Sequence, residues 1–92
     1  MKITVEYAAQ AKEAAEISFE TMDISPSSSL QDIAEAACHS RGEKLCAMLL
    51  DARGCLHRSI LILVNEAQIF HEDALELNEG DRLMFLPPVS GG

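Results

Sequence analysis

The last six residues of the chain offer the clearest possibility for chemistry. They are Pro87, Pro88, Val89, Ser90, Gly91 and Gly92. Consecutive prolines have fixed φ angles and no backbone donors, so they should lead the chain out of a sheet in an extended conformation. The two glycines lack the Cβ atom that would block entry into a narrow active-site channel. The sequence therefore predicts an extended, mobile tail, residues 87–92, that presents the carboxylate of Gly92 to another protein.

The histidines and cysteines do not suggest a second site. The histidines fall in three separate segments with no second ligand at helical or hairpin spacing, so no metal site is expected at His39, His57 or His71. The cysteines form no Cys-x-x-Cys pair, and nothing in the sequence singles out a reactive thiol among Cys38, Cys46 and Cys55. Any acid, base or metal used at Gly92 would have to come from a partner.

The charge balance limits the kinds of partner. Seven Lys and Arg residues against fifteen Asp and Glu residues give a formal net charge of −8. This is the wrong sign for attraction to nucleic-acid phosphates or to anionic membranes, so neither is expected as a partner. Two explanations of the acidity remain open: partners with basic docking surfaces, or a charge that only maintains solubility.

The length of the chain favours a single domain, residues 1–92. A core of this size is too small to enclose a cofactor among catalytic groups, so no bound cofactor is expected. The N-terminal segment lacks the apolar run of a signal peptide, and no stretch approaches the roughly 20 apolar residues of a membrane span. We therefore expect a cytoplasmic protein.

Two alternating segments predict a β-hairpin at the start of the chain. Residues 2–7 place Ile3, Val5 and Tyr7 on one face, as a half-buried strand requires. After the connection 8–15, alternation resumes, with Ile17 and Phe19 expected to point inward. The polar residues of this second segment, expected to point outward, are Glu16, Ser18 and Glu20.

A helix should follow the serines at 27–29. Ser28 and Gln31 have the spacing of a capping box, and Gly42 is a suitable stop. Between them, one apolar stripe at helical spacing consists of Leu30, Ile33, Ala34, Ala37 and Cys38. The polar residues expected to face water are Gln31, Asp32 and Glu35.

The second half of the chain contains turns that separate short apolar segments. Turns are expected at 51–54, 65–66 and 78–81, where Asp, Asn and Gly occur at turn positions. The segment 60–64 is apolar at every position, so a strand there would have apolar side chains on both faces. Further strands are expected at 69–70, as a short edge, and at 83–86, as the last strand.

This order of elements predicts an α+β roll, with a mixed sheet and one main helix packed on one face. The first and last strands could pair as parallel neighbours, and residues 1–86 would form the globular body. In the last strand, Leu83 and Phe85 cannot share a face with Met84 and Leu86, so one pair should be available to a partner unless both faces are covered. Arg82 could orient a carboxylate of that partner, or could simply be solvated.

The chain resembles the MoaD and ThiS sulfur carriers. The resemblance is carried by Leu-Asn-Glu-Gly-Asp at 77–81 and by Leu-Met-Phe-Leu-Pro-Pro-Val-Ser-Gly-Gly at 83–92. The final Pro-Pro-Val-Ser-Gly-Gly is most similar to MoaD, the small subunit of molybdopterin synthase. The first strand, the helix introduced by serines and the step at 63–65 also fit that family, which implies a β-grasp, or ubiquitin-like, fold.

The resemblance also implies a reaction and its partners. An ATP-dependent adenylyltransferase/sulfurylase would form an acyl-adenylate on Gly92, and sulfur from a persulfide donor would convert it to a thiocarboxylate. In MoaD-like proteins this sulfur builds the dithiolene of molybdopterin, on a precursor held by the large subunit of molybdopterin synthase. The alternatives left open are a carrier for thiamin thiazole or another sulfur-transfer pathway, a ubiquitin-like protein modifier, and a plain binding module.

Overall fold

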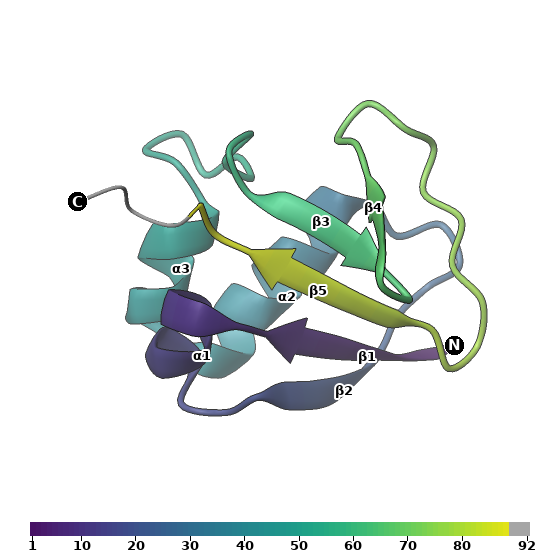
Figure 1. The fold of residues 1–92 in the computed structure, drawn as a ribbon, viewed down its shortest axis with the longest axis horizontal. Coiled ribbons are helices and arrows are strands. Elements are labelled where there is room, and N and C mark those ends of the chain that lie inside the picture. The colour runs from purple at the N-terminus through teal and green to yellow at the C-terminus, as the bar shows by residue number, and fades with distance from the viewer. Residues whose placement is uncertain (89–92) are drawn as a thin grey trace.

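The computed structural model describes residues 1–88 and contains a mixed five-stranded sheet in the order β2-β1-β5-β3-β4 (Figure 1). The strands are β1 (Lys2–Tyr7), β2 (Phe19–Asp23), β3 (Leu61–Val64), β4 (Ala67–Ile69) and β5 (Arg82–Leu86). Strand β1 is antiparallel to β2 and parallel to β5, and β3 is antiparallel to both β4 and β5. The predicted α+β class and the parallel pairing of the first and last strands are confirmed.

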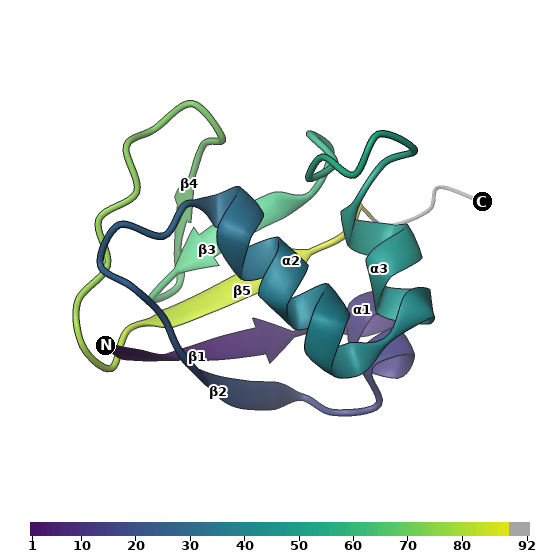
Figure 2. The same ribbon diagram turned by 180° about the vertical axis from the view of Figure 1, so that it is seen from behind.

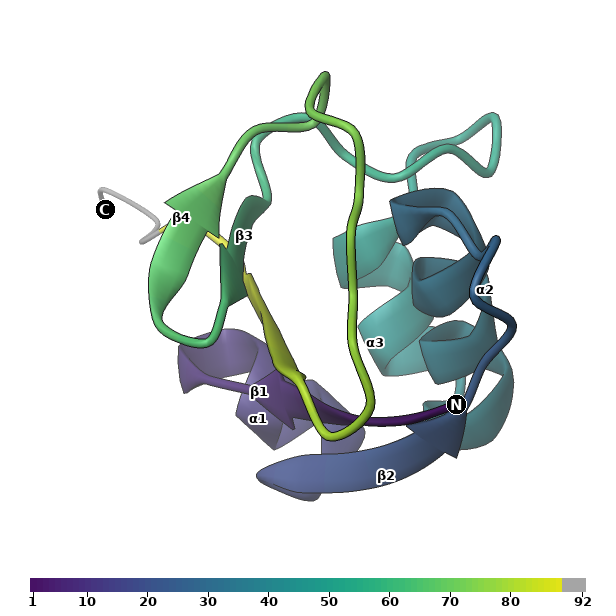
Figure 3. The same cartoon turned by 90° about the vertical axis from the view of Figure 1, so that its right-hand side faces the viewer.

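Helices pack against one side and one end of this sheet. They are α1 (Ala9–Ala15), α2 (Leu30–Arg41) and α3 (Glu43–Leu49). Figure 2, which views the molecule from behind, shows α2 crossing in front of the strands, with α1 and α3 side by side at one end of the sheet. Seen edge on in Figure 3, the strands form one layer and α2 and α3 the other, and the loop 70–81 runs between them on the side nearest the viewer.

The core fills the space between the two layers. The buried strand residues are Ile3, Val5, Tyr7, Met22, Ile62, Leu83 and Phe85. The buried helix residues are Ala11, Ala15, Leu30, Ile33, Ala34, Ala37, Leu45 and Leu49. Four of these helix positions are alanine, which allows the helices to approach the sheet closely. Burial of this apolar surface is the main force that holds the helices against the strands.

The main helix begins one residue later than the sequence suggests. Ser29, not Ser28, is the N-cap: its hydroxyl accepts a hydrogen bond from the Asp32 amide at 3.1 Å, and the Asp32 carboxylate accepts one from the Ser29 amide at 3.0 Å. Gln31, expected to face water, instead binds the loop between α3 (Glu43–Leu49) and β3. Its side chain donates a hydrogen bond to the Gly54 carbonyl and accepts one from the Leu56 amide. The apolar stripe and the stop at Gly42 are confirmed.

The inward and outward faces of β2 are the reverse of those predicted. Val5 pairs with Glu20 and Glu6 with Phe19, so Glu20 shares the inner face with Val5, and Phe19 is 57% exposed. Glu20 has partners there, because its carboxylate accepts hydrogen bonds from the hydroxyls of Tyr7 at 2.6 Å and Ser40 at 3.0 Å. A carboxylate can face a core when such partners replace its water.

An ion pair completes this polar group. The Nε atom of Arg41 lies 3.3 Å from Oε2 of Glu20, the oxygen that accepts from Tyr7, although not in hydrogen-bonding geometry. Burial, followed by the hydrogen bond to Glu20, raises the pKa of the Tyr7 hydroxyl. The alternation rule failed here because Tyr7, Ser40 and Arg41, which satisfy Glu20, come from other elements.

Two short helices join the one main helix that was expected. Helix α1 forms from the connection 8–15, whose Ala, Gln, Lys and Glu residues all have high helix propensity. Helix α3 covers most of the apolar segment 45–50 and buries Leu45 and Leu49. Helix α3 therefore extends the layer that covers the inner face, and α1 packs beside α3 at the end of the sheet.

The predicted turns are confirmed. The Gly54 amide donates to the Asp51 carbonyl at 2.9 Å, and the Asp81 amide donates to the Asn78 carbonyl at 3.0 Å. Backbone amides of Cys55 and Arg53 bind the Asp51 carboxylate and lower its pKa. Asn65 and its neighbour Glu66 have φ angles of 49° and 74°, which suits the tight hairpin between β3 and β4.

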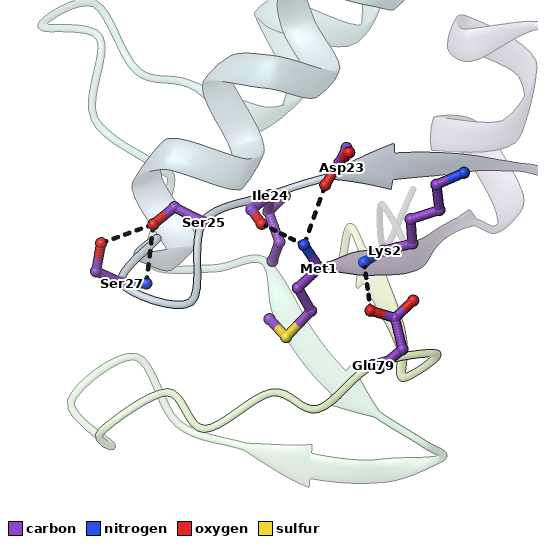
Figure 4. A network of polar contacts seen from close by, with 7 residues as sticks. All are labelled: Met1, Lys2, Asp23, Ile24, Ser25, Ser27 and Glu79. Carbon is purple, nitrogen blue, oxygen red and sulfur yellow. Dashed lines mark hydrogen bonds and ion pairs between the residues drawn. The ribbon is translucent and has the colours of Figure 1, made fainter.

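The beginning of β1 is fastened on both sides (Figure 4). The backbone nitrogen of Met1 donates to the Asp23 carboxylate and to the Ile24 carbonyl, each at 3.1 Å. The Lys2 amide donates to the Glu79 carboxylate at 3.1 Å. These contacts join the first strand to the end of β2 and to the turn that precedes β5.

Candidate functional site

Strand β5 separates the predicted partner-binding residues into two groups. Leu83 and Phe85 are fully buried beneath the helices, so they cannot contact a partner, and their inclusion among the partner-binding residues is wrong. The reason is the sheet pairing, which places Phe85 beside Tyr7 and Ile62 on the inner face. Met84 and Leu86 alternate with them and lie on the opposite face of the sheet.

That opposite face carries an apolar surface. Leu86 pairs with Leu61, and Met84 pairs with Leu63, so four large apolar side chains lie together on β5 and β3. Leu61 is 41% exposed, and the other three are half-buried. Figure 1 looks onto this face, which none of the described helices covers. Exposed apolar groups of this kind are typical of protein-binding sites.

Phe19 lies on the same face. It pairs with Glu6, and Glu6 in turn pairs with Met84, so the three side chains form a row across β2, β1 and β5. We define the open face as this surface, made of Phe19, Leu61, Leu63, Met84 and Leu86. The sequence prediction missed Phe19, Leu61 and Leu63 as site residues, although the segment 60–64 did indicate apolar side chains on both faces.

Arg82 borders the open face at the start of β5. Its side chain is exposed and lies 4.0 Å from the Glu66 carboxylate, across the turn that precedes β4. An exposed pair at this distance contributes little to stability. Its backbone amide donates a hydrogen bond to the Asn65 side chain at 3.0 Å, which fixes the start of the strand. The side chain is therefore placed where a partner could reach it.

The root of the predicted tail follows directly from β5. Pro87 is buried and Pro88 is exposed. A surface depression beside them is lined by three residues of α1, which are Ala9, Gln10 and Glu13. The folded body thus continues through Pro87, one residue beyond the predicted boundary at Leu86. The predictions for Val89, Ser90, Gly91 and Gly92 lie outside the described residues.

The open face and the tail root are neighbours in the structure. Leu86 is the last residue of β5, its cross-strand partner is Leu61, and Pro87 follows at once. A partner seated on these leucines would therefore contact the body at the point where the chain leads towards Gly92. This arrangement can position a tail, although the described side chains supply no reacting group of their own to it.

The thiols and histidines do not form a metal centre in the part of the chain that the structure describes. Residues 1–88 contain no group of three His, Cys, Asp or Glu side chains able to hold a metal ion. Cys38 and Cys46 interact through their side chains, and burial together with this hydrogen bond raises the pKa of Cys38 to about 12. Cys38 is therefore a poor nucleophile at neutral pH.

No helix within residues 1–88 has both the length and the apolar character needed to span a membrane.

Solved structures with the same architecture define the class of fold. Small archaeal modifier protein 1 from Haloferax volcanii matches with a TM-score of 0.84 and 23% identity, over 100% of both chains. Its counterpart from Methanosarcina acetivorans has a TM-score of 0.80 and 26% identity, over 99% of this chain and 96% of that one. A chain of the complex of molybdopterin-converting factor subunits 1 and 2 from Helicobacter pylori has a TM-score of 0.62 and 21% identity, over 100% of both chains.

These similarities identify the fold as a ubiquitin-like β-grasp. The model of the ThiS family matches residues 5–92, nearly the whole chain. The chain therefore belongs to the ThiS family. No curated protein matches it. The predicted resemblance to MoaD and ThiS is confirmed at the level of family and fold, and the structural neighbours include both modifier proteins and a molybdopterin-converting factor.

Proposed function

We propose that this protein is a sulfur carrier whose Gly92 carboxylate is adenylated and then converted to a thiocarboxylate. The observation that carries this proposal is the ThiS-family match, which runs through residue 92 and so includes both terminal glycines. The structure supports it because β5 connects an uncovered apolar face directly to the root of the tail. We also propose that this chemistry takes place in the cytoplasm, as the sequence predicts.

The chemistry explains why a partner enzyme is needed. A carboxylate is a poor electrophile, so sulfur cannot replace oxygen until the carboxylate is activated. An ATP-dependent adenylyltransferase would join AMP to the Gly92 carboxylate and release pyrophosphate. Attack by a persulfide sulfur would then release AMP, and reductive cleavage of the sulfur–sulfur bond by a thiol would leave the thiocarboxylate. The carrier binds no cofactor of its own in this scheme.

The contribution of the carrier is positioning. The open face would hold the body on each partner, and the tail from Pro88 onward would enter the active site of that partner. Holding a reacting group in place in this way converts a collision between two molecules into a reaction within one complex. The apolar side chains of the open face would supply most of the docking energy.

We further propose that the sulfur acceptor is the precursor of molybdopterin, held by a large synthase subunit. The complex of molybdopterin-converting factor subunits 1 and 2 among the similar structures supports this pathway. Thiamin thiazole synthesis and other sulfur-transfer pathways would use the same carrier chemistry. A pull-down followed by identification of the bound subunit would choose between them.

The central test measures the mass of the intact protein. The chain is incubated with the activating enzyme of the same organism, ATP and a sulfur donor. Its mass should rise by the difference between sulfur and oxygen, and a variant that lacks Gly91 and Gly92 should not change. An unchanged mass of the wild-type chain under these conditions would refute the sulfur-carrier function.

A second candidate function is protein modification. It is favoured by the similar structures described as small archaeal modifier proteins. Here the activated Gly92 would form an isopeptide bond with a lysine amine of a target, with release of AMP. Adducts that require Gly92 would support this function, whereas thiocarboxylate without adducts would exclude it. A plain binding module would instead keep full function after deletion of both glycines.

A further inference from the structure

Glu6 occupies an unusual position within the apolar row. It is the last residue of β1 on the uncovered side of the sheet, and its neighbours on the adjacent strands are Phe19 and Met84. Its side chain is half-buried, although no helix of the described residues covers this side. A single carboxylate therefore lies between two large apolar side chains, in line with Leu63 on the next strand.

This carboxylate has no partner among the described residues, which contain no hydrogen bond or ion pair to it. Two other acidic residues, by contrast, have hydrogen-bond partners in the fold. Glu20 binds Tyr7, Ser40 and Arg41, and the Asp81 carboxylate accepts hydrogen bonds from the Asn65 side chain and the Asn78 amide. The fold thus provides partners for the carboxylates of Glu20 and Asp81 and leaves that of Glu6 unpaired.

The nearest cation on the same face does not satisfy Glu6. Arg82 lies one row away, beside Thr4 on β1, and its ion pair is with Glu66 on the other side. In the free protein, the negative charge of the Glu6 carboxylate is therefore stabilised by solvent, because the side chain is only half-buried. A partner that covered the open face with apolar side chains alone would remove this water and leave an uncompensated charge, at a large cost.

We propose that the partner surface that docks on the open face is apolar with one cationic side chain, an arginine or a lysine, placed over Glu6. This inference rests on the proposed function, because it names the chemistry of the partner for the same face. The pair would be enclosed by Phe19 and Met84, where a charge pair shielded from water contributes more than one at a rim. The net charge of −8 favours the same kind of partner.

A second copy of this chain is the competing occupant. Two copies would bring together two bodies that each carry a formal charge of −8, which opposes association. A basic partner avoids this repulsion. Because residues 1–88 show one uncovered sheet face, partners that use the carrier in turn would share the same cationic feature.

The test compares affinities for the activating enzyme of the same organism. Wild type, Glu6→Gln and Glu6→Arg are titrated with the purified enzyme, and Glu43→Gln serves as the control because Glu43 is an exposed acid on α3, in the helix layer. We expect Glu6→Gln to weaken binding by about 10- to 100-fold and Glu6→Arg by more, since each leaves the cation of the partner unpaired. Glu43→Gln should change the affinity by less than about twofold.

A charge exchange identifies the partner residue. Replacing the facing Arg or Lys of the enzyme with Glu should restore binding of Glu6→Arg and weaken binding of wild type. Unfolding curves of each variant show whether it is folded, so that a loss of affinity can be assigned to the interface. Sedimentation of the chain alone over a range of concentrations tests self-association.

The outcomes separate this inference from the proposed function. If Glu6→Gln binds the enzyme with wild-type affinity while the wild-type chain acquires sulfur, the inference of a partner cation over Glu6 is refuted and the carrier function stands. Self-association that Glu6→Gln abolishes would show that a second copy occupies the face, and would also overturn the inference. A wild-type chain that neither binds the enzyme nor gains sulfur would overturn both.

Discussion

The two faces of the central strands differ far less in composition than in environment. On β3 and β5, Ile62 and Phe85 are completely buried, whereas their neighbours Leu61 and Leu86 lie on the uncovered side. All four side chains are large and apolar. Their burial is decided by α2 and α3, which lie on one side of the sheet (Figure 3). An apolar side chain in this molecule therefore has either a structural or a binding role according to which layer it faces.

The largest expected effect on stability is at the covered face. Phe85→Ala should lower the free energy of unfolding by about 3–5 kcal/mol, because it leaves a cavity beneath the helices. Chemical denaturation monitored by circular dichroism measures this change. Leu86→Ala is the matched substitution on the other face and should cost much less. Equal losses for the two variants would contradict the distinction between the faces.

Removal of the Tyr7 hydroxyl should have an intermediate effect. Tyr7→Phe takes one hydrogen bond from Glu20 on the covered face and should cost about 1–2 kcal/mol. The substitution should also change the response to alkaline pH. The pKa of Tyr7 is raised in the folded state, so its contribution to stability is present below the unfolded pKa near 10.0 and declines above it.

This decline can be isolated because the chain has a single tyrosine. Tyrosinate absorbance of the folded protein should develop only well above pH 10, and Tyr7→Phe should lose less stability than wild type over the same range. Tyrosinate absorbance near the ordinary pKa, in a protein that is still folded, would show that the hydroxyl is not held by Glu20.

A smaller effect is expected where the covering helix begins. Ser29→Ala removes the N-cap of α2 and should cost about 1 kcal/mol. Ser28→Ala is the control, because the Ser28 hydroxyl makes no capping hydrogen bond in the described structure. Thermal unfolding of the two variants locates the start of the helix, and a larger loss for Ser28→Ala would contradict the cap described above.

The smallest effect on stability is expected at the open face. Leu61→Ser should change the free energy of unfolding by less than about 1 kcal/mol, since Leu61 is already 41% exposed. Binding of the activating enzyme should nevertheless weaken clearly, as measured by titration. A Leu61→Ser variant with normal affinity would show that partners dock elsewhere.

Much of the framework could be predicted from local patterns. The alternation of β1, the apolar stripe of α2, the turns and the last strand all depend on residues close together in the chain. The face of β2 could not be predicted, because Glu20 is stabilised inside by Tyr7 and Arg41, which lie far from it in sequence. Because Glu20 faces inward, Phe19, the preceding residue of β2, lies on the open face.

The site was predictable only in part for the same reason. Alternation along β5 showed that Met84 and Leu86 lie on one face and Leu83 and Phe85 on the other, but both pairs are apolar. Only the position of the helices decides which pair is free. The isolation of Glu6 likewise depends on strand pairing, which places Phe19 and Met84 on either side of it.

The position of β5 has a mechanical consequence. Because β5 lies between β1 and β3, its backbone is hydrogen-bonded along both edges. An enzyme that drew the residues after Pro87 into a channel would pull β5 along its own axis. The force would then be distributed over the hydrogen bonds to both β1 and β3, which would have to break together. The protein can thus be gripped at this end repeatedly without the strand being peeled from the sheet.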